Sequence, residues 1–184
     1  MLSFTTASTT QDLQQILALQ QVNLSKNISK EESRAQGFLT VEHDFDILKA
    51  MNDACPHVIA KVEDQVVGYT LVMLEQFKDR IPILVPMFEK VNQLEWKNRV
   101  VGNLQYFIMG QVCIAKDWRG QGIFSGLYQH MKLALADRFD CIITEVATRN
   151  TRSMRAHEKV GFEVLEIYDG ETEEWAIVGW DWRA

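Results

Sequence analysis

The amino-acid sequence predicts a mixed α/β fold, formed by one domain over residues 1–184. Segments with the apolar spacing of amphipathic helices alternate with Val- and Ile-rich segments typical of buried strands. Strand–helix–strand units occupy the second half of the chain. No internal repeat, low-complexity tract or Ser/Gly/Pro-rich linker marks a domain boundary. A single domain of this length can bury about 70% of the surface of its unfolded chain.

The chain is predicted to begin with a short strand and a helix. Alternating side chains over residues 2–6 favour the strand. Thr9 or Thr10 can cap the helix, in which apolar residues recur every three to four positions as far as about Leu24. A polar stretch over residues 25–36 follows this helix.

A second short helix, a hairpin and a third short helix are predicted next. Asp44 or Asp46 can begin the second helix. Residues 57–62 and 66–74 are rich in Val, Ile and Leu and are separated by three polar residues, which predicts a β-hairpin. Pro86 precedes apolar residues at a period of three to four, which predicts the third helix.

The second half is predicted to alternate strands and helices. Residues 104–115 are apolar enough to form a strand buried on both faces. An apolar stripe at every fourth position predicts a helix over residues 123–135. Residues 141–146 predict another buried strand. A short helix over residues 153–159 is predicted to end at Gly161, because glycine tolerates the positive φ of a C-cap.

An antiparallel pair of strands is predicted to close the domain. Residues 162–168 and 175–182 form the pair, with an acidic loop over residues 169–174 between them. The complete order of elements is that of a mixed α/β protein.

The charge is unevenly distributed along the chain. The 19 basic and 25 acidic residues give a formal net charge of −6. Residues 116–159 contain eight basic and five acidic residues, a net of +3, and the remainder carries −9. Binding to nucleic acid needs an extended basic surface, so nucleic acid is excluded as a partner. One small anion bound within the basic segment fits this pattern.

Membrane, export and metal signals are not visible in the sequence. The longest uncharged stretch, residues 100–115, has 16 residues, whereas a membrane-spanning helix needs about 20 apolar ones. The first five residues lack the basic and apolar regions of an export signal. Three cysteines without a CxxC pair argue against a disulfide framework and a cysteine zinc site. We therefore expect a cytoplasmic protein with no membrane segment and no metal.

The most informative segment is a strand, a turn and a helix start. The strand over residues 112–114 is followed by Arg119 and then by Gly120 and Gly122, just before the helix predicted at Ile123. Glycines at a helix start let backbone N–H groups approach an anion such as phosphate. An ordinary tight turn is the alternative. The segment is not a Walker A loop, and it has one glycine too few for a dinucleotide fingerprint.

Two segments resemble the signatures of the GNAT superfamily of N-acetyltransferases. Residues 119–124 match most of its R/Q-x-x-G-x-G/A acyl-CoA pyrophosphate motif, and residues 112–114 resemble its central strand. Residues 150–162 resemble its second signature, an Asn-led helix that ends in Gly-Phe. The CoA-binding residues implied by the resemblance are Val112, Cys113, Ile114, Arg119, Gly120, Gln121, Gly122, Ile123, Phe124, Asn150 and Ser153.

The resemblance implies a fold and an activity. The fold is a mixed, mostly antiparallel central sheet flanked by helices, with a splayed central strand pair that forms the CoA cleft. The activity is direct transfer of an acetyl group from acetyl-CoA to a primary amine of a small molecule or peptide, and relatives often form homodimers. A non-catalytic acyl-CoA sensor or scaffold with the same fold is the alternative. A nucleotide-binding α/β protein is a third, remote one.

Three positions depart from the family pattern. Phe124 stands where the motif ends in Gly or Ala. His157 stands where many relatives carry a tyrosine that protonates the departing thiolate. Ile108 stands where several relatives carry a basic glutamate on the central strand. The assignment of catalytic residues therefore depends on other side chains.

Acetyl transfer to an amine needs a base, an oxyanion donor and an acid. An alkylammonium has a pKa of about 10.4, so a base must accept its proton before attack, and Glu145 is the candidate. The resemblance assigns the oxyanion donor to a backbone N–H near Val112 or Cys113. His157 is the candidate acid, because an unperturbed imidazole has a pKa of about 6.5. Alternatively, Glu145 is exposed or paired with a nearby arginine, and His157 only packs against the cofactor.

The acceptor side carries weaker signals. The resemblance places the acceptor pocket on residues 25–53 and 76–99, where Glu42, His43 and Asp44 are candidates to hold or deprotonate the amine. A solvated loop with a helix cap is the alternative. Arg149, Arg152 and Arg155 are candidates for the basic CoA side or for a solvated helix face. Cys113, inside an apolar strand, is expected to be inert.

Overall fold

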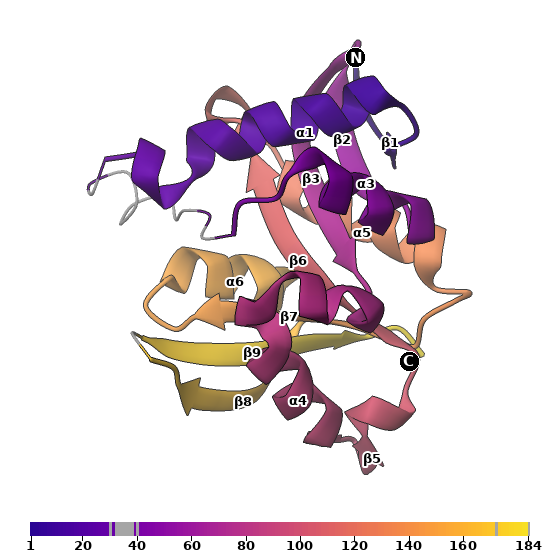
Figure 1. Ribbon diagram of the computed structural model, residues 1–184, viewed down its shortest axis with the longest axis vertical. Helices are drawn as coiled ribbons and strands as arrows, with labels where there is room; N and C mark the ends of the chain where they lie inside the picture. The colour runs from indigo at the N-terminus through magenta and orange to yellow at the C-terminus, as the bar shows by residue number, and fades with distance from the viewer. Residues whose placement is uncertain (30, 32–38, 40, 172, 184) are drawn as a thin grey trace. The chain divides into compact units, whose positions relative to one another are not determined.

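The computed structural model describes residues 1–29, 31, 39, 41–171 and 173–183. One seven-stranded sheet has the strand order β1-β2-β3-β6-β7-β9-β8, and its pairs are mostly antiparallel. The chain divides into two compact units: unit 1, Met1–Val72 with Gly110–Met131, and unit 2, Met73–Met109 with Lys132–Ala184. Figure 1 shows the elements of each unit along the chain.

Unit 1 is built on three antiparallel strands and the second half of β6. The strands are β1 (Leu2–Thr6), β2 (Val58–Val62), β3 (Gln65–Met73) and β6 (Tyr106–Ile114). β1 pairs with β2 from Leu2 opposite Val62 to Thr6 opposite Val58, and β2 forms a hairpin with β3. Beyond the end of β6, the N–H of Ala115 donates to the Val67 carbonyl at 2.8 Å.

Helices cover both faces of these strands. The helices are α1 (Thr10–Asn23), α3 (Phe45–Ala54) and α5 (Ile123–Leu135), of which residues 123–131 belong to unit 1. The main core of unit 1 joins α1 and α3 to the strands through Ile16, Leu48 and Tyr69, while Ile123 and Leu127 of α5 lie against Gly68. In Figure 1, α1 and α3 lie in front of β1–β3 and α5 lies behind them.

Unit 2 contains the remaining strands. They are β4 (Glu95–Trp96), β5 (Arg99–Val100), β7 (Cys141–Ala147), β8 (Glu163–Asp169) and β9 (Glu174–Asp181). β6 and β7 run parallel from Tyr106 opposite Cys141 to Ile108 opposite Ile143, and β7–β9 and β8–β9 are antiparallel. The parallel register covers only three residue pairs, although β6 and β7 have nine and seven residues.

Different elements pack on the two faces of the β7–β9–β8 strands. On one face, α4 (Val85–Gln93) and the β4–β5 hairpin contact β8 and β9 through Lys90 and Trp96. On the other face, Trp180 contacts Gly161, which ends α6 (Thr151–Val160), and Lys132 of α5 lies over the Trp180 ring.

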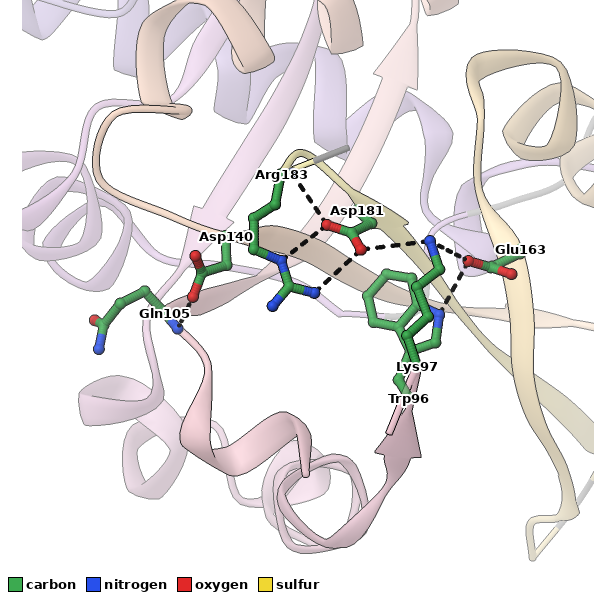
Figure 2. A network of polar contacts seen from close by, with 7 residues as sticks. All are labelled: Trp96, Lys97, Gln105, Asp140, Glu163, Asp181 and Arg183. Atoms are coloured by element: carbon green, nitrogen blue, oxygen red, sulfur yellow. Dashed lines mark hydrogen bonds and ion pairs between the residues drawn. The ribbon is translucent and has the colours of Figure 1, made fainter. Parts of the chain in front are cut away.

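A charged network fixes the β4–β5 hairpin to β8 and β9 (Figure 2). Arg183 forms two hydrogen bonds with the Asp181 carboxylate at 3.0 and 3.1 Å and lowers the pKa of Asp181 to about 2. Lys97 lies between Asp181 and Glu163, 3.3 and 3.1 Å from their oxygens, and Trp96 Nε1 donates to Glu163 at 3.0 Å. This network gives Glu163 and Asp181 a structural role.

Most of the predicted elements are confirmed. Thr9 caps α1 in a capping box with Asp12, and Asp44 caps α3. α5 has the predicted bounds, and Gly161 ends α6 with a φ of +124°. The mixed, mostly antiparallel fold class is confirmed as well. That residues 1–184 form one domain stays a prediction.

One prediction about burial is wrong in part. Residues 107–109 of β6 are buried on both faces, but the second half of the strand alternates, with Val112 and Ile114 half-buried. Only the row of Gln111 and Cys113 faces the core there. The structure also adds short elements that were not predicted: the β4–β5 pair and the 3-10 turns Ser25–Asn27, Glu75–Arg80, Pro82–Leu84, Val101–Asn103 and Lys116–Trp118. Residues 30 and 32–36 of the polar stretch lie outside the described residues.

Candidate active site

The turn between β6 and α5 has two glycines in the left-handed backbone region. Gly120 and Gly122 have φ values of +77° and +79°, which side-chain-bearing residues adopt only with strain. A Cβ atom built on either glycine meets no atom within 4 Å. The backbone of the turn therefore borders open space, as a ligand that binds main-chain N–H groups requires.

The start of α5 adds favourable electrostatics for an anion. The first hydrogen bond within the helix runs from the Gly126 N–H to the Gly122 carbonyl at 3.0 Å. N–H groups before that point have no carbonyl partner inside a helix, and the helix dipole places partial positive charge there. Residues 119–124 thus combine exposed glycines with a helix N-terminus, the geometry that favours phosphate.

Arg119 holds this turn in place through its side chain. Its Nε donates to the Ile114 carbonyl at 3.1 Å, and its Nη2 donates to Asn23 Oδ1 at 2.7 Å. Asn23 is the last residue of α1, and its Nδ2 donates to the Leu19 carbonyl at 2.8 Å. The guanidinium therefore positions the turn within unit 1, and the partner Asn23 was not predicted from the sequence.

Phe124 is accommodated by its own helix. Its ring is half-buried, with its centroid 5.0 Å from that of Tyr128 one turn later. The large side chain at the last motif position therefore packs along α5.

The family resemblance implies that the glycine turn binds the pyrophosphate of CoA, and a side chain at Gly122 is then expected to weaken that binding. Alanine at a φ of +79° stores about 1–3 kcal/mol of strain, and its Cβ occupies the open space of the turn. We expect Gly122→Ala to raise the Kd for CoA by about tenfold or more, measured by titration calorimetry. The control is Asn98→Ala, at another positive-φ position (+61°) in the turn between β4 and β5, which should leave the Kd unchanged; an unchanged Kd in Gly122→Ala would contradict the assignment.

A buried polar network fixes the second half of β6. Gln111 Oε1 accepts the Tyr69 hydroxyl at 2.7 Å and Gln20 Nε2 at 2.9 Å, and Gln111 Nε2 donates to the Val41 carbonyl at 2.8 Å. Gln111, Tyr69 and Gln20 are all buried. Because buried polar groups are costly to leave unpaired, these bonds hold β6 beside α1 and β3 within unit 1.

The predicted acceptor residues have structural partners. His43 is buried, and its backbone N–H donates to Gln20 Oε1 at 2.8 Å. Burial lowers the pKa of the His43 imidazole to about 4. Glu42 accepts hydrogen bonds from Gln21 and Lys26, both at 2.6 Å, and Asp44 caps α3. The arrangement favours the alternative of a loop with a helix cap.

Cys113 has the environment of an inert thiol. It is 7% exposed, and burial raises its pKa to about 12. A thiolate nucleophile is therefore not formed near neutral pH, as the sequence predicted.

Glu145 lies on β7 in a half-buried environment. The Tyr168 hydroxyl of β8 donates to Glu145 Oε1 at 2.5 Å. Burial raises the pKa of Glu145, while Tyr168 and Lys90 act in the opposite direction. Lys90 of α4 lies 4.7 Å from the centre of the Tyr168 ring and pairs with Glu166 at 2.7 Å. The sequence left two alternatives for Glu145, an exposed carboxylate or one paired with a nearby arginine. The half-buried Glu145, bonded to Tyr168, fits neither.

His157 is enclosed in α6. It is 2% exposed, its ring lies edge-on to Phe162 at 5.0 Å, and its Nδ1 donates to the Ser153 carbonyl at 2.9 Å. Burial lowers the pKa of His157 to about 4, so the imidazole is neutral at neutral pH. An imidazole with this pKa holds no acidic proton to donate near neutral pH, contrary to the expectation from the sequence, and the role of His157 as an acid stays a prediction.

The structure does not bring Glu145 and His157 together on one face. Trp180, which contacts the C-terminal end of α6, is paired with Ile142. Side chains alternate along a strand, so Glu145 points to the face opposite Trp180. Glu145 therefore shares its face with α4.

The beginning of α6 contains the other residues of the second signature. Asn150 caps the helix, because its Oδ1 accepts the Ser153 N–H at 3.1 Å. Arg149 pairs with Glu173, with Nε 2.5 Å from a carboxylate oxygen. Asn150 and Ser153 thus shape the N-terminal turn of α6, and their contact with a ligand stays a prediction.

Comparison with known proteins decides the family. The model of the acetyltransferase (GNAT) family matches residues 21–162, which cover both the glycine turn and α6. The chain belongs to the GNAT acetyltransferase family. As a GNAT protein it is an acetyl-CoA-dependent acyltransferase. No curated protein sequence matches the chain at the required significance.

Solved structures share the GNAT fold with this chain. The ribosomal-protein-S18-alanine N-acetyltransferase from Escherichia coli matches with a TM-score of 0.63 and 14% identity, covering 98% of this chain and 94% of its own. YncA from Salmonella typhimurium, solved with its cofactor acetyl-CoA, matches with a TM-score of 0.64 and 12% identity, covering 99% and 94%. At these identities the likeness concerns the fold.

Two further findings concern membrane-spanning helices and metal-binding clusters among the described residues. None of the helices in the described part of the chain is long and apolar enough to cross a membrane. Residues 1–29, 31, 39, 41–171 and 173–183 contain no cluster of three or more His, Cys, Asp or Glu side chains suited to a metal. A cytoplasmic location and the absence of a metal stay predictions.

Proposed function

We propose that the protein transfers an acetyl group from acetyl-CoA to a primary amine of a small molecule or peptide. The observation that supports this most is the glycine turn before α5, with two left-handed glycines that face open space. The family match establishes acetyltransferase chemistry, and the geometry of the turn supports a proposed site for the pyrophosphate of CoA.

The proposed pyrophosphate site uses main-chain groups of the turn before α5. N–H groups of Gly120, Gln121, Gly122, Ile123 and Phe124 would bind the pyrophosphate, and Arg119 would keep their turn in shape. Within unit 1, Val112, Cys113 and Ile114 of β6 are proposed CoA-binding residues. Within unit 2, the family resemblance assigns contact with the pantetheine arm to Asn150 and Ser153.

Glu145 is the proposed base. When the neutral amine attacks, a bond forms between its nitrogen and the acetyl carbon, and the carbon–sulfur bond of the thioester breaks. The amine must lose a proton to the base, directly or through one water. A backbone N–H near Val112 or Cys113 would stabilise the oxyanion. The departing thiolate needs a proton, for which His157 is the sequence candidate.

Thiol release from acetyl-CoA tests this function. The full chain is incubated with acetyl-CoA and a panel of small and peptide amines, with CoA binding measured in parallel. We expect amine-dependent thiol release with at least one class of acceptor. Binding of CoA without release in the presence of any amine would contradict the enzyme and favour a non-catalytic acyl-CoA sensor. The sensor alternative is motivated by Ile108, Phe124 and His157, the three positions that depart from the family pattern.

A further inference from the structure

The face of unit 2 that carries Glu145 also carries a phenol, Tyr168, and a second carboxylate, Glu166. Glu145 of β7 and Glu166 of β8 both lie opposite Ile177 of β9, so the three side chains form a row on one face. Tyr168 lies two residues after Glu166 and points to the same face. Its hydroxyl reaches across β9 to Glu145, above the fully buried Ile177.

We propose that Tyr168, assisted by Lys90, is a positioning residue that orients the Glu145 carboxylate for its role as the base. This proposal rests on the proposed function of Glu145. The Tyr168 hydroxyl donates to Oε1 at 2.5 Å and thereby fixes the carboxylate in one orientation. Tyr168 does not engage the other oxygen, Oε2, which is the one that would take the proton.

The position of Lys90 is fixed by two contacts. Its ammonium pairs with Glu166 at 2.7 Å and lies 4.7 Å from the centre of the Tyr168 ring. The charge of Lys90 also favours the ionised form of Glu145. A cation over the ring and an acceptor at its hydroxyl together hold Tyr168 in place. α4 thus contributes a charge to the Glu145 face although it carries no family motif.

The groups that act on the ionisation of Glu145 come from two elements. Tyr168 of β8 and Lys90 of α4 favour the carboxylate, Glu166 of β8 lies next to Lys90, and β9 contributes the apolar Ile177. Burial opposes them and raises the pKa of Glu145. Without the Tyr168 hydroxyl, only Lys90 opposes the effect of burial on Glu145. The pKa of Glu145 then rises, and the carboxyl keeps its proton to a higher pH.

The Tyr168→Phe variant tests the proposal. The acidic limb of the pH profile of kcat/KM should move upward by about one pH unit, since a hydrogen bond to a charged group contributes that much or more. The carbon-13 signal of the Glu145 carboxyl should report the same upward displacement without any turnover. This second readout separates a failure of the proposal from a failure of the proposed function.

Two further variants make the test specific. Tyr106→Phe is the matched control, because the half-buried Tyr106 hydroxyl donates to Asn92 at 2.8 Å and should leave the pKa of Glu145 unchanged. Lys90→Met should displace that pKa in the same direction as Tyr168→Phe, by less, and serves if Tyr168→Phe does not fold. An unchanged Glu145 pKa in both Tyr168→Phe and Lys90→Met, or an equal displacement in Tyr106→Phe, would overturn the proposal.

Discussion

Glu145→Gln is expected to lower kcat/KM for acetyl transfer by about 10²-fold, with the Kd for acetyl-CoA unchanged within about twofold. Glutamine has nearly the shape of glutamate, and its amide oxygen can still accept the Tyr168 hydroxyl that bonds Glu145 Oε1. It cannot take up the proton of the amine, so only the base is lost. Steady-state thiol release at saturating acetyl-CoA and calorimetric titration of CoA measure the two quantities.

A second glutamine variant on the same face provides the control. Glu163 accepts a hydrogen bond from Trp96, and a glutamine at that position can still accept it. Glu163→Gln should therefore keep kcat/KM within about twofold of the parent. A Glu145→Gln variant that retains more than half of the parent activity would contradict the assignment of Glu145 as base.

The protein is expected to lose stability steeply as the pH falls from about 6.5 towards 5. Burial lowers the pKa of His43 and His157 to about 4 and of His57 to about 3. The unfolded chain binds protons at these sites below about pH 6.5, whereas the folded chain does not, so acid favours unfolding. At pH 5 each site contributes about 2 kcal/mol of lost stability, comparable in sum with the stability of a typical domain.

The carboxyl groups do not mask this effect. The lowered pKa values of Asp12 and Asp181 also remove stability in acid, but only near and below pH 4. The raised pKa of Glu145 has the opposite sign and adds stability as the pH falls. The window from about pH 6.5 to 5 therefore reports mainly the buried histidines.

Urea unfolding at pH 7.5, 6 and 5 measures this dependence. His57 accepts the Val72 N–H at 3.0 Å and is fully buried, so His57→Gln should lower the stability at pH 7.5 and flatten its fall with acid. His130→Gln, at a partly buried position on α5, is the control and should follow the parent. A free energy of unfolding that is constant between pH 7.5 and 5 would contradict the buried, neutral histidines.

Elements with strong local signals could be predicted from the sequence. α5 has the predicted bounds because its apolar stripe starts directly after the glycine turn. The β4–β5 hairpin has only two residues in each strand, and its turn places Lys97 and Asn98 at positive φ. The usual signal for such a turn is Asn-Gly, so nothing in the sequence marked it.

In the candidate site, too, local features could be predicted from the sequence and long-range contacts could not. The glycine turn is local, and its residues specify its backbone. Tyr168 is 23 residues from Glu145, and their contact depends on the register of β7, β9 and β8, which no local pattern fixes. The burial of His157 beside Phe162 depends on the packing of the distant Trp180 against Phe162, so its lowered pKa could not be predicted.

Transfer of a labelled acetyl group tests the central claim most directly. The protein is incubated with acetyl-CoA that carries a carbon-13 acetyl group and with the amine acceptor that gives the fastest thiol release. Mass spectrometry should find the label on the amine nitrogen in a one-to-one ratio with free CoA, and Glu145→Gln should lower both about 10²-fold. Free CoA without labelled amide, or no labelled amide from any acceptor while acetyl-CoA binds, would contradict acetyl transfer by this protein.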